Sequence, residues 1–174
     1  AARFLGVTSH DVPTFDGQFK NFNTYQLVRI INETVANFCR SDSEKIEAWH
    51  VPLTLGIDPL GERGVPTRGL GHFALAEYVL PFANVAWEDL KKREGKMRFT
   101  HDHYLKMYAL SKPVIQGDVL FFDEAQDANP VIKSIVMNQD HLQKVLVGDE
   151  NQAIYGFTGA LDAMGEFAKT GATV

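Results

Sequence analysis

Two short apolar runs, separated by a segment with helical character, constrain this chain most. The first run is Val119-Leu120-Phe121-Phe122 and the second is Val145-Leu146-Val147. Between them, Asn129-Pro130 offers a helix cap followed by proline at the first helical position. A strand, a helix and a strand within about 30 residues form a βαβ unit, whose strands run parallel and are usually covered on both faces. The pattern therefore predicts two parallel, buried strands.

Acidic residues follow both predicted strands. Asp123 and Glu124 come directly after the first strand, and Gly148-Asp149-Glu150 follows the second. Ligands of parallel sheets gather at the carboxyl ends of the strands. Of two adjacent carboxylates there, one can hold Mg²⁺ while the other orients or deprotonates a water that attacks a phosphoryl group. The alternative is that the pair only begins a loop and caps the next helix.

A neutral amide and two aromatic rings follow the second acidic cluster. Gln152 can sense a terminal phosphate without adding charge, and it would lie beside the first site. Tyr155 and Phe157 flank a glycine, and aromatic rings on a glycine-rich turn can stack on nucleic-acid bases. The alternative for each ring is ordinary packing in the core.

The first two thirds of the chain are predicted to be mainly helical. Residues 1–22 are expected to be irregular, and residues 50–71, rich in glycine and proline, are expected to form a surface loop rather than a packed element. Helices are predicted from Asn23 or Thr24 to about Arg40, over residues 72–93, and from a Thr100 cap to Leu110. The residues expected to face the core are Leu27, Ile30, Ile31, Val35 and Phe38 in the first helix and Leu105, Tyr108 and Ala109 in the third.

Charge is unevenly distributed along the chain. The net charge is -5, which argues against a general nucleic-acid coat protein. Residues 91–112, however, hold seven basic and two acidic side chains. Such a positive block can contact phosphates, or it can be a solvated helix end and loop. The side chains considered for phosphate contact are Lys91, Lys92, Arg93, Lys96 and Arg98.

Several other classes of protein find little support in the sequence. The single cysteine, Cys39, excludes an intramolecular disulfide and favours a reducing, intracellular setting. No apolar run approaches the roughly 18 residues that span a bilayer, so no membrane partner is expected. His101 and His103 flank Asp102, but positions two apart diverge on a helix, so a metal site there is not favoured. Trp49 and Trp87 are interpreted as packing residues.

Two segments carry a resemblance to a known family. Phe121-Phe122-Asp123-Glu124-Ala125-Gln126-Asp127 resembles motif II, the Walker B element, of the UvrD/Rep family of superfamily 1 DNA helicases. Residues 147–160, from Val147-Gly148-Asp149 to Thr158-Gly159-Ala160, resemble motif III of that family. Thr100-His101-Asp102-His103-Tyr104-Leu105-Lys106 is similar to the branch that includes F-box DNA helicases, and Thr14-Phe15-Asp16-Gly17 is compared with motif Ib.

The resemblance implies a role for each matching residue. Asp123 would bind the Mg²⁺ of Mg-ATP, Glu124 would be the catalytic base, and Gln152 would contact the γ-phosphate. Gln126 and Asp127 would couple the nucleotide to DNA. Tyr155 and Phe157 would line the single-strand track, although Thr158 replaces the arginine that the family usually has. The partners implied are ATP and single-stranded or partly duplex DNA, in the nucleus of a eukaryote or in the cytoplasm (nucleoid) of a bacterium or phage.

The resemblance also implies an α/β fold: a partial RecA-like parallel sheet of P-loop NTPase type (domain 1A) with an inserted, mainly helical subdomain (1B). Residues 1–20 and 113–174 would belong to domain 1A, and residues 21–112 to subdomain 1B. The sequence has no Walker A loop, G-x-x-x-x-G-K-[ST], because Glu62 follows Gly61 at the nearest attempt, and it has no arginine after Arg98. We therefore expect an internal helicase fragment that hydrolyses no appreciable ATP alone.

Two alternatives remain beside the helicase fragment. The same fold could hold single-stranded DNA without hydrolysis, and the open reading frame around the chain would discriminate between the two functions. Clustered carboxylates also suit a metal-dependent nuclease, which ranks last because Gln152 and the Gly156-Phe157-Thr158-Gly159-Ala160 turn have no role there.

Overall fold

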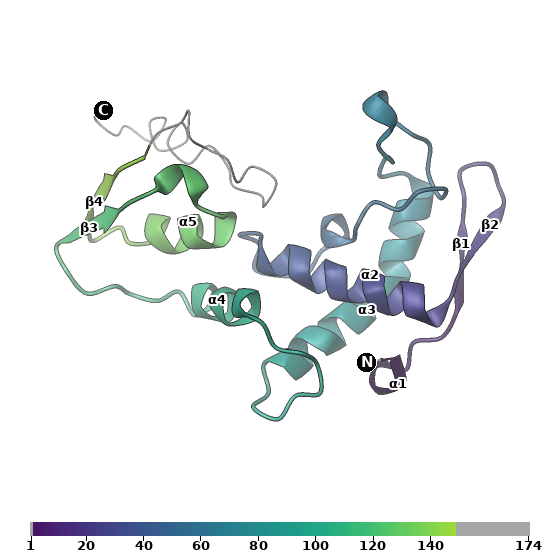
Figure 1. Ribbon diagram of the computed structural model, residues 1–174, viewed down its shortest axis with the longest axis horizontal. Coiled ribbons are helices and arrows are strands. Elements are labelled where there is room, and N and C mark those ends of the chain that lie inside the picture. The colour runs from purple at the N-terminus through teal and green to yellow at the C-terminus, as the bar shows by residue number, and fades with distance from the viewer. Residues whose placement is uncertain (1, 149–174) are drawn as a thin grey trace. The chain divides into compact units, whose positions relative to one another are not determined.

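The computed structural model describes residues 2–148, which form a mixed α/β fold in two compact units (Figure 1). Unit 1 comprises Ala1–Phe38 and Ser43–Thr100, and unit 2 comprises Cys39–Asp42 and the chain from His101 onward. The boundaries that we predict for the helicase domains stay predictions. No helix among the described residues is long and apolar enough to cross a membrane.

Unit 1 begins with a short helix and a β-hairpin, so the expectation of an irregular N-terminus is wrong. Helix α1 spans Ala2–Leu5, and strands β1 (His10–Pro13) and β2 (Phe19–Phe22) pair antiparallel, with His10 opposite Phe22. The intervening turn contains Gly17 at φ 79°, and the Gly17 amide donates to the Thr14 carbonyl at 3.0 Å. Each strand is only four residues long, too short for alternation to be read from the sequence.

Helix α2 confirms the prediction closely and spans Thr24–Cys39. Asn23 caps it: the Gln26 amide donates to Asn23 Oδ1 and the Asn23 amide donates to Gln26 Oε1, both at 2.9 Å. This reciprocal pair is a capping box. The predicted apolar stripe is buried, namely Leu27, Ile30, Ile31, Val35 and Phe38.

The glycine- and proline-rich segment 50–71 is more tightly packed than the sequence indicates. It contains the 3₁₀ turn η2 (Glu62–Gly64) and follows η1 (Ala48–His50), and both Ile57 and Asp58 are buried. The Asp58 carboxylate accepts from the Gly71 amide at 3.0 Å and the His72 amide at 2.6 Å. The segment therefore caps the following helix, and the expectation of a surface loop is wrong at these positions.

Helix α3 spans Leu70–Leu90 and includes Pro81. Its buried residues include Leu75, Val79 and Trp87, and the Trp87 ring meets the Phe38 ring edge-on at 5.3 Å between centroids. Trp87 thus packs as predicted. Trp49 is 46% exposed and stacks on His50, with the ring centroids 3.7 Å apart.

In unit 2, helix α4 (His101–Leu110) packs against α5, and its fully buried residues differ from the ones that we predict. Its buried residues are His103 and Lys106, whereas Tyr108 is 49% exposed. The Lys106 ammonium donates to the Ser41 carbonyl at 2.7 Å, which lets a charged side chain occupy an interior position. Hydrophobic periodicity does not reveal a buried lysine. The prediction that Tyr108 faces the core is wrong, whereas Leu105 and Ala109 are half-buried.

The predicted βαβ unit is present in unit 2. Strand β3 (Val119–Phe122) lies parallel to β4 (Gln143–Leu146), and helix α5 (Pro130–Met137) connects them. Asn129 caps α5 by accepting from the Ile132 amide at 2.9 Å, as predicted. One sheet face packs on this helix through Leu120, Phe122, Leu146, Ala128, Val136 and Met137.

Among residues 2–148, no element covers the other face of this small sheet, so the predicted burial of both strands is only half right. Phe121 is 76% exposed, and Val119 and Val147 are 42% and 54% exposed. Alternate residues of a strand point to opposite faces, so one face packs while the other stays accessible. The strands are parallel as predicted, but within residues 2–148 only α5 covers them.

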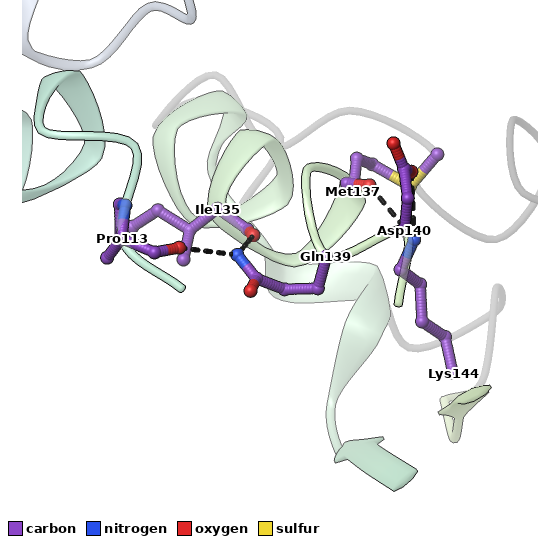
Figure 2. Close-up of polar contacts among 6 residues, drawn as sticks. All are labelled: Pro113, Ile135, Met137, Gln139, Asp140 and Lys144. Carbon is purple, nitrogen blue, oxygen red and sulfur yellow. Dashed lines mark hydrogen bonds and ion pairs between the residues drawn. The ribbon is translucent and has the colours of Figure 1, made fainter. Parts of the chain in front are cut away.

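A buried glutamine fixes the path of the chain into β3 (Figure 2). The Gln139 side-chain amide donates to the carbonyls of Pro113 and Ile135, both at 2.8 Å, and its oxygen accepts from the Ile115 amide at 2.9 Å. Nearby, the Lys144 ammonium donates to the Met137 carbonyl at 2.9 Å. The end of α5 thereby holds both the segment before β3 and the strand β4.

Candidate functional site

The carboxyl ends of β3 and β4 lie side by side, as the βαβ pattern predicts. Phe122 pairs with Leu146, and beyond this pair the Val147 amide donates to the Phe122 carbonyl at 2.9 Å. The Ala125 amide then donates to the Val147 carbonyl at 3.0 Å. The turn that holds Asp123 and Glu124 is therefore attached to the end of the neighbouring strand.

The backbone at Glu124 adopts a left-handed conformation, with φ 53° and ψ 40°. This conformation costs a residue with a side chain about 1–2 kcal/mol, and such strain gathers at functional sites. Two hydrogen bonds hold the turn: the Glu124 amide donates to Asp123 Oδ1 at 2.9 Å, and the Gln126 side-chain amide donates to Glu124 Oε2 at 2.5 Å. Both carboxylates remain exposed to solvent.

The residues behind the acidic pair are packed closely. Gln126, in the 3₁₀ turn η3 (Ala125–Asp127), is only 5% exposed. A Cβ atom at Gly148 would lie 2.3 Å from Gln126 Oε1 and 3.2 Å from the Ala125 nitrogen. Gly148 is therefore needed for this close approach. Asp127 Oδ1 is buried and has no hydrogen-bond partner among the described residues.

The acidic pair suits Mg²⁺ better than a metal ion whose ligands all come from protein side chains. Magnesium is usually held by one or two carboxylates together with substrate phosphates and water. Asp123 is exposed and only its Oδ1 is engaged by the described chain, through the Glu124 amide. Within the part of the chain that the structure describes, no group of three or more histidine, cysteine or acidic residues is placed to hold a metal.

The other residues that the sequence analysis considered for a site lie in two places, and the structure adds one residue that it did not consider. Gln152, Tyr155 and Phe157 lie outside the described residues, so their predicted position beside Asp123 stays a prediction. His101 is exposed and His103 is buried on α4. Burial lowers the pKa of His103. Gln139, which no pattern in the sequence marks, supports the site by fixing the approach to β3.

The basic block of residues 91–98 forms a compact turn after α3. The buried Asp89 carboxylate accepts from the backbone amides of Lys96 and Met97, at 2.6 and 2.8 Å. This arrangement leaves the basic side chains on the surface, and all five are exposed: Lys91, Lys92, Arg93, Lys96 and Arg98.

Two of these basic side chains already have neighbours. Lys91 pairs with Glu88 at 2.5 Å, and the Lys96 ammonium lies 5.1 Å from the centre of the Phe4 ring. Within residues 2–148, Lys92, Arg93 and Arg98 form no ion pair. The turn therefore offers at least three cations that a phosphate backbone can reach.

An acidic pair at the end of a strand in a parallel βαβ unit is common to many proteins that bind phosphate groups. Comparison with known proteins shows to which family of such proteins this chain belongs. Residues 99–169 match the family described as the UvrD/REP helicase N-terminal domain. The chain belongs to the UvrD-like superfamily 1 DNA helicases.

Among individual proteins, the chain is similar to two eukaryotic F-box DNA helicases. F-box DNA helicase 1 of Gallus gallus is 36% identical over 141 residues, which is 78% of this chain and 13% of that protein. F-box DNA helicase protein 1 of Schizosaccharomyces pombe is 34% identical over 133 residues, 68% of this chain and 15% of the relative.

A bacterial relative is more distant. The RecBCD enzyme subunit RecB of Mycobacterium tuberculosis is 26% identical over 174 residues, 89% of this chain and 15% of that protein. The chain thus spans between 13% and 15% of the length of these relatives. No solved structure matches it significantly.

Proposed function

We propose that this chain carries the metal and water side of ATP hydrolysis in an ATP-dependent DNA helicase or translocase. The hydrolysis of Mg-ATP would drive movement on single-stranded DNA. One observation supports this proposal above all: an exposed Asp-Glu pair lies where two parallel strands end together, within the segment that matches the helicase family. The proposal includes the finer fold, a RecA-like domain 1A with an inserted 1B-like subdomain.

Each residue of the turn has a distinct role in the proposal. Asp123 would hold Mg²⁺, and a bound Mg²⁺ neutralises charge on the phosphate oxygens. Glu124 would accept a proton from the attacking water. The Gln126 amide, which donates to Glu124 Oε2, would orient that carboxylate so that its other oxygen faces the water. The left-handed backbone at Glu124 would keep both carboxylates on the accessible side of the turn.

The remaining roles follow from the resemblance. Gln152 would contact the γ-phosphate, and Gln126 with Asp127 would couple that contact to DNA. Tyr155 and Phe157 would stack on bases of the single strand. Single-stranded or partly duplex DNA would be the partner, and the eukaryotic F-box relatives favour a nuclear location.

The hydrolysis step is tested in the protein encoded by the open reading frame around this chain. We expect a Walker A loop upstream and arginine-bearing motifs downstream. In that protein, Glu124→Gln is expected to lower kcat for DNA-stimulated ATP hydrolysis at least about 100-fold, because loss of a general base typically costs about 10²–10⁴ in rate. Binding of a fluorescent ATP analogue should persist, since the amide keeps the shape of the side chain.

Glu62→Gln is the matched control, because Glu62 is an exposed glutamate on the η2 turn of unit 1. It should leave kcat unchanged. Equal kcat values for Glu124→Gln and the unmodified protein would contradict the proposed role. An open reading frame without a Walker A loop would instead favour the second candidate, a module on the same fold that holds single-stranded DNA without hydrolysis.

A further inference from the structure

A groove in unit 1 is separate from the acidic turn and from the basic block. It lies between strand β2, helix α2 and the loop around Leu53, and its volume is about 320 Å³. Sites for small ligands range from about 300 to 1,000 Å³, so the groove suits one flat ring system and its substituents. The rings of Phe22 and Tyr25 and the aliphatic side chains of Ile30, Pro52, Leu53 and Leu55 supply its apolar walls.

Lys20 and Arg29 line the groove, and they differ in whether the described chain already engages their charged groups. Lys20 donates to the Leu55 carbonyl and lies 5.4 Å from the centre of the Phe22 ring, so its ammonium is held in place. Arg29 is not buried and forms no hydrogen bond or ion pair within residues 2–148. Its guanidinium presents donors in a fork that matches the oxygens of a phosphate.

Tyr25 gives the groove an aromatic rim that is 79% exposed. Tyr25 and Arg29 are four residues apart on α2, so they are neighbours on one helix face. The capping box between Asn23 and Gln26 fixes the turn from which Tyr25 projects. The helix backbone therefore sets the ring and the guanidinium side by side on one face before any ligand binds.

The charge of the lining favours an anionic occupant. Lys20 and Arg29 are balanced only in part by Glu33, so the groove is locally positive on a chain whose net charge is -5. Base stacking on an aromatic ring with a phosphate contact beside it is how proteins bind single-stranded nucleic acid without sequence preference. An acidic peptide would satisfy the cations but would not need the exposed ring.

We propose that this groove binds one nucleotide of single-stranded DNA, with the base stacked on Tyr25 and the adjoining phosphate held by Arg29. This assignment rests on the proposed function in taking DNA as the ligand. It adds a contact that is independent of residues 91–98 and of the segment after residue 148. Glu33 would weaken the contact, because its carboxylate lies on the same stretch of α2 as Arg29.

The test uses the 174-residue chain and a fluorescein-labelled dT15 strand, with affinity measured by fluorescence anisotropy at low salt. Tyr25→Ala should weaken binding at least about 5-fold, in the range found when a stacking ring is removed, whereas Tyr25→Phe should bind like the unmodified chain. Arg29→Gln should weaken binding and reduce the steepness of its salt dependence by about 0.7, the value for one phosphate contact on single strands. Glu33→Gln should tighten binding.

Tyr108→Ala is the matched control, since Tyr108 is an exposed tyrosine on α4, which contributes nothing to the lining of the groove. Thermal melting of each variant reports whether it folds. In addition, a dT15 strand with one 5-iodouracil is photocrosslinked to the unmodified chain, and the adduct is mapped by mass spectrometry. We expect adducts within residues 20–33 or 52–55.

The outcomes separate this proposal from the proposed function. If Tyr25→Ala and Arg29→Gln bind like the unmodified chain and crosslinks fall only within residues 91–98, the groove proposal is overturned while DNA binding stands. If the unmodified chain does not bind dT15 at low salt, the groove proposal fails. In that case the ATP hydrolysis measured with Glu124→Gln still decides the enzymatic role separately.

Discussion

His72 is a buried histidine whose neutral form the fold favours. It is 1% exposed, its Nε2 lies 3.2 Å from the Ala48 carbonyl, and its Nδ1 has no partner among the described residues. Burial is the main cause that lowers the pKa of His72 below its ordinary value of 6.5. As the pH falls, the unfolded chain takes up a proton at this position before the folded chain does.

Stability that depends on neutral His72 should therefore be complete above pH 6.5 and decline as the pH falls through the lower pKa of the folded state. Replacing His72 with Phe removes the titration and the contact with Ala48. We expect His72→Phe to be about 1–3 kcal/mol less stable at about pH 7.5, and this deficit should shrink at about pH 5.5. Urea unfolding at both values checks the prediction.

The exposed histidine control, His101→Gln, should follow the pH dependence of the unmodified chain. His103 is also buried with a lowered pKa, so some acid sensitivity should remain in His72→Phe. A deficit that stays constant between the two pH values would show that His72 does not contribute to acid sensitivity.

At the acidic turn, the sequence indicates which residues are present but not why each is required. The adjacency of Asp123 and Glu124 at a strand end is predictable, because the apolar run stops there. The left-handed backbone of Glu124 is not, since nothing about glutamate favours it. The sequence shows only that Gly148 follows the second apolar run, whereas the structure shows that its hydrogen side chain is needed for the close approach of Gln126.

At the scale of elements, Gln139 connects helix α5 to the segment before β3 (Figure 2). Replacing it with Ala would leave the Pro113 carbonyl and the Ile115 amide without their side-chain partner. A buried polar group left unpaired costs about 1–3 kcal/mol. We expect Gln139→Ala to be destabilised by at least about 2 kcal/mol in chemical denaturation.

Gln143→Ala is the matched control, since Gln143 is an exposed glutamine on β4. Its change in stability should lie within about 0.5 kcal/mol, as is usual for surface substitutions. Equal stability of the two variants would mean that the Gln139 hydrogen bonds do not hold β3 in place.

Elements were predictable where local signals were strong. The cap and stripe of α2, and the Asn129-Pro130 start of α5, follow from residue chemistry within one or two turns. The hairpin of β1 and β2 and the buried face of α4 depend on partners distant in sequence. Lys106 is the clearest case, because a carbonyl at Ser41 makes its burial possible.

At the scale of the whole molecule, the basic block tests the proposed contact with DNA. Changing all five residues to Gln should flatten the salt dependence of single-stranded DNA binding, by about 0.7 in slope for each phosphate that the chain no longer neutralises. The residues are Lys91, Lys92, Arg93, Lys96 and Arg98. Fluorescence anisotropy across a salt series measures the slope.

The double substitution Lys45→Gln and Arg63→Gln removes exposed cations outside the block and should leave the slope nearly unchanged. An unchanged slope in the five-residue variant would reject the role of residues 91–98. Thermal melting should confirm folding, since the Asp89 carboxylate that holds this turn is left intact.

The parallel pairing and the adjacent strand ends were within reach of the sequence, and so was the helicase family. Alternation alone could not indicate that one face of the sheet would be open, since a short apolar run suits either a half-buried or a fully buried strand. The position of Gln152 relative to Asp123 depends on residues beyond 148 and stays a prediction.

The open face of the β3–β4 sheet has a practical consequence for anyone who purifies this chain. Val119, Phe121 and Val147 expose apolar side chains to water, and large exposed apolar surface promotes aggregation. DNA-binding measurements should use dilute protein and a mild detergent, because aggregated protein can raise the anisotropy of the labelled strand without specific binding.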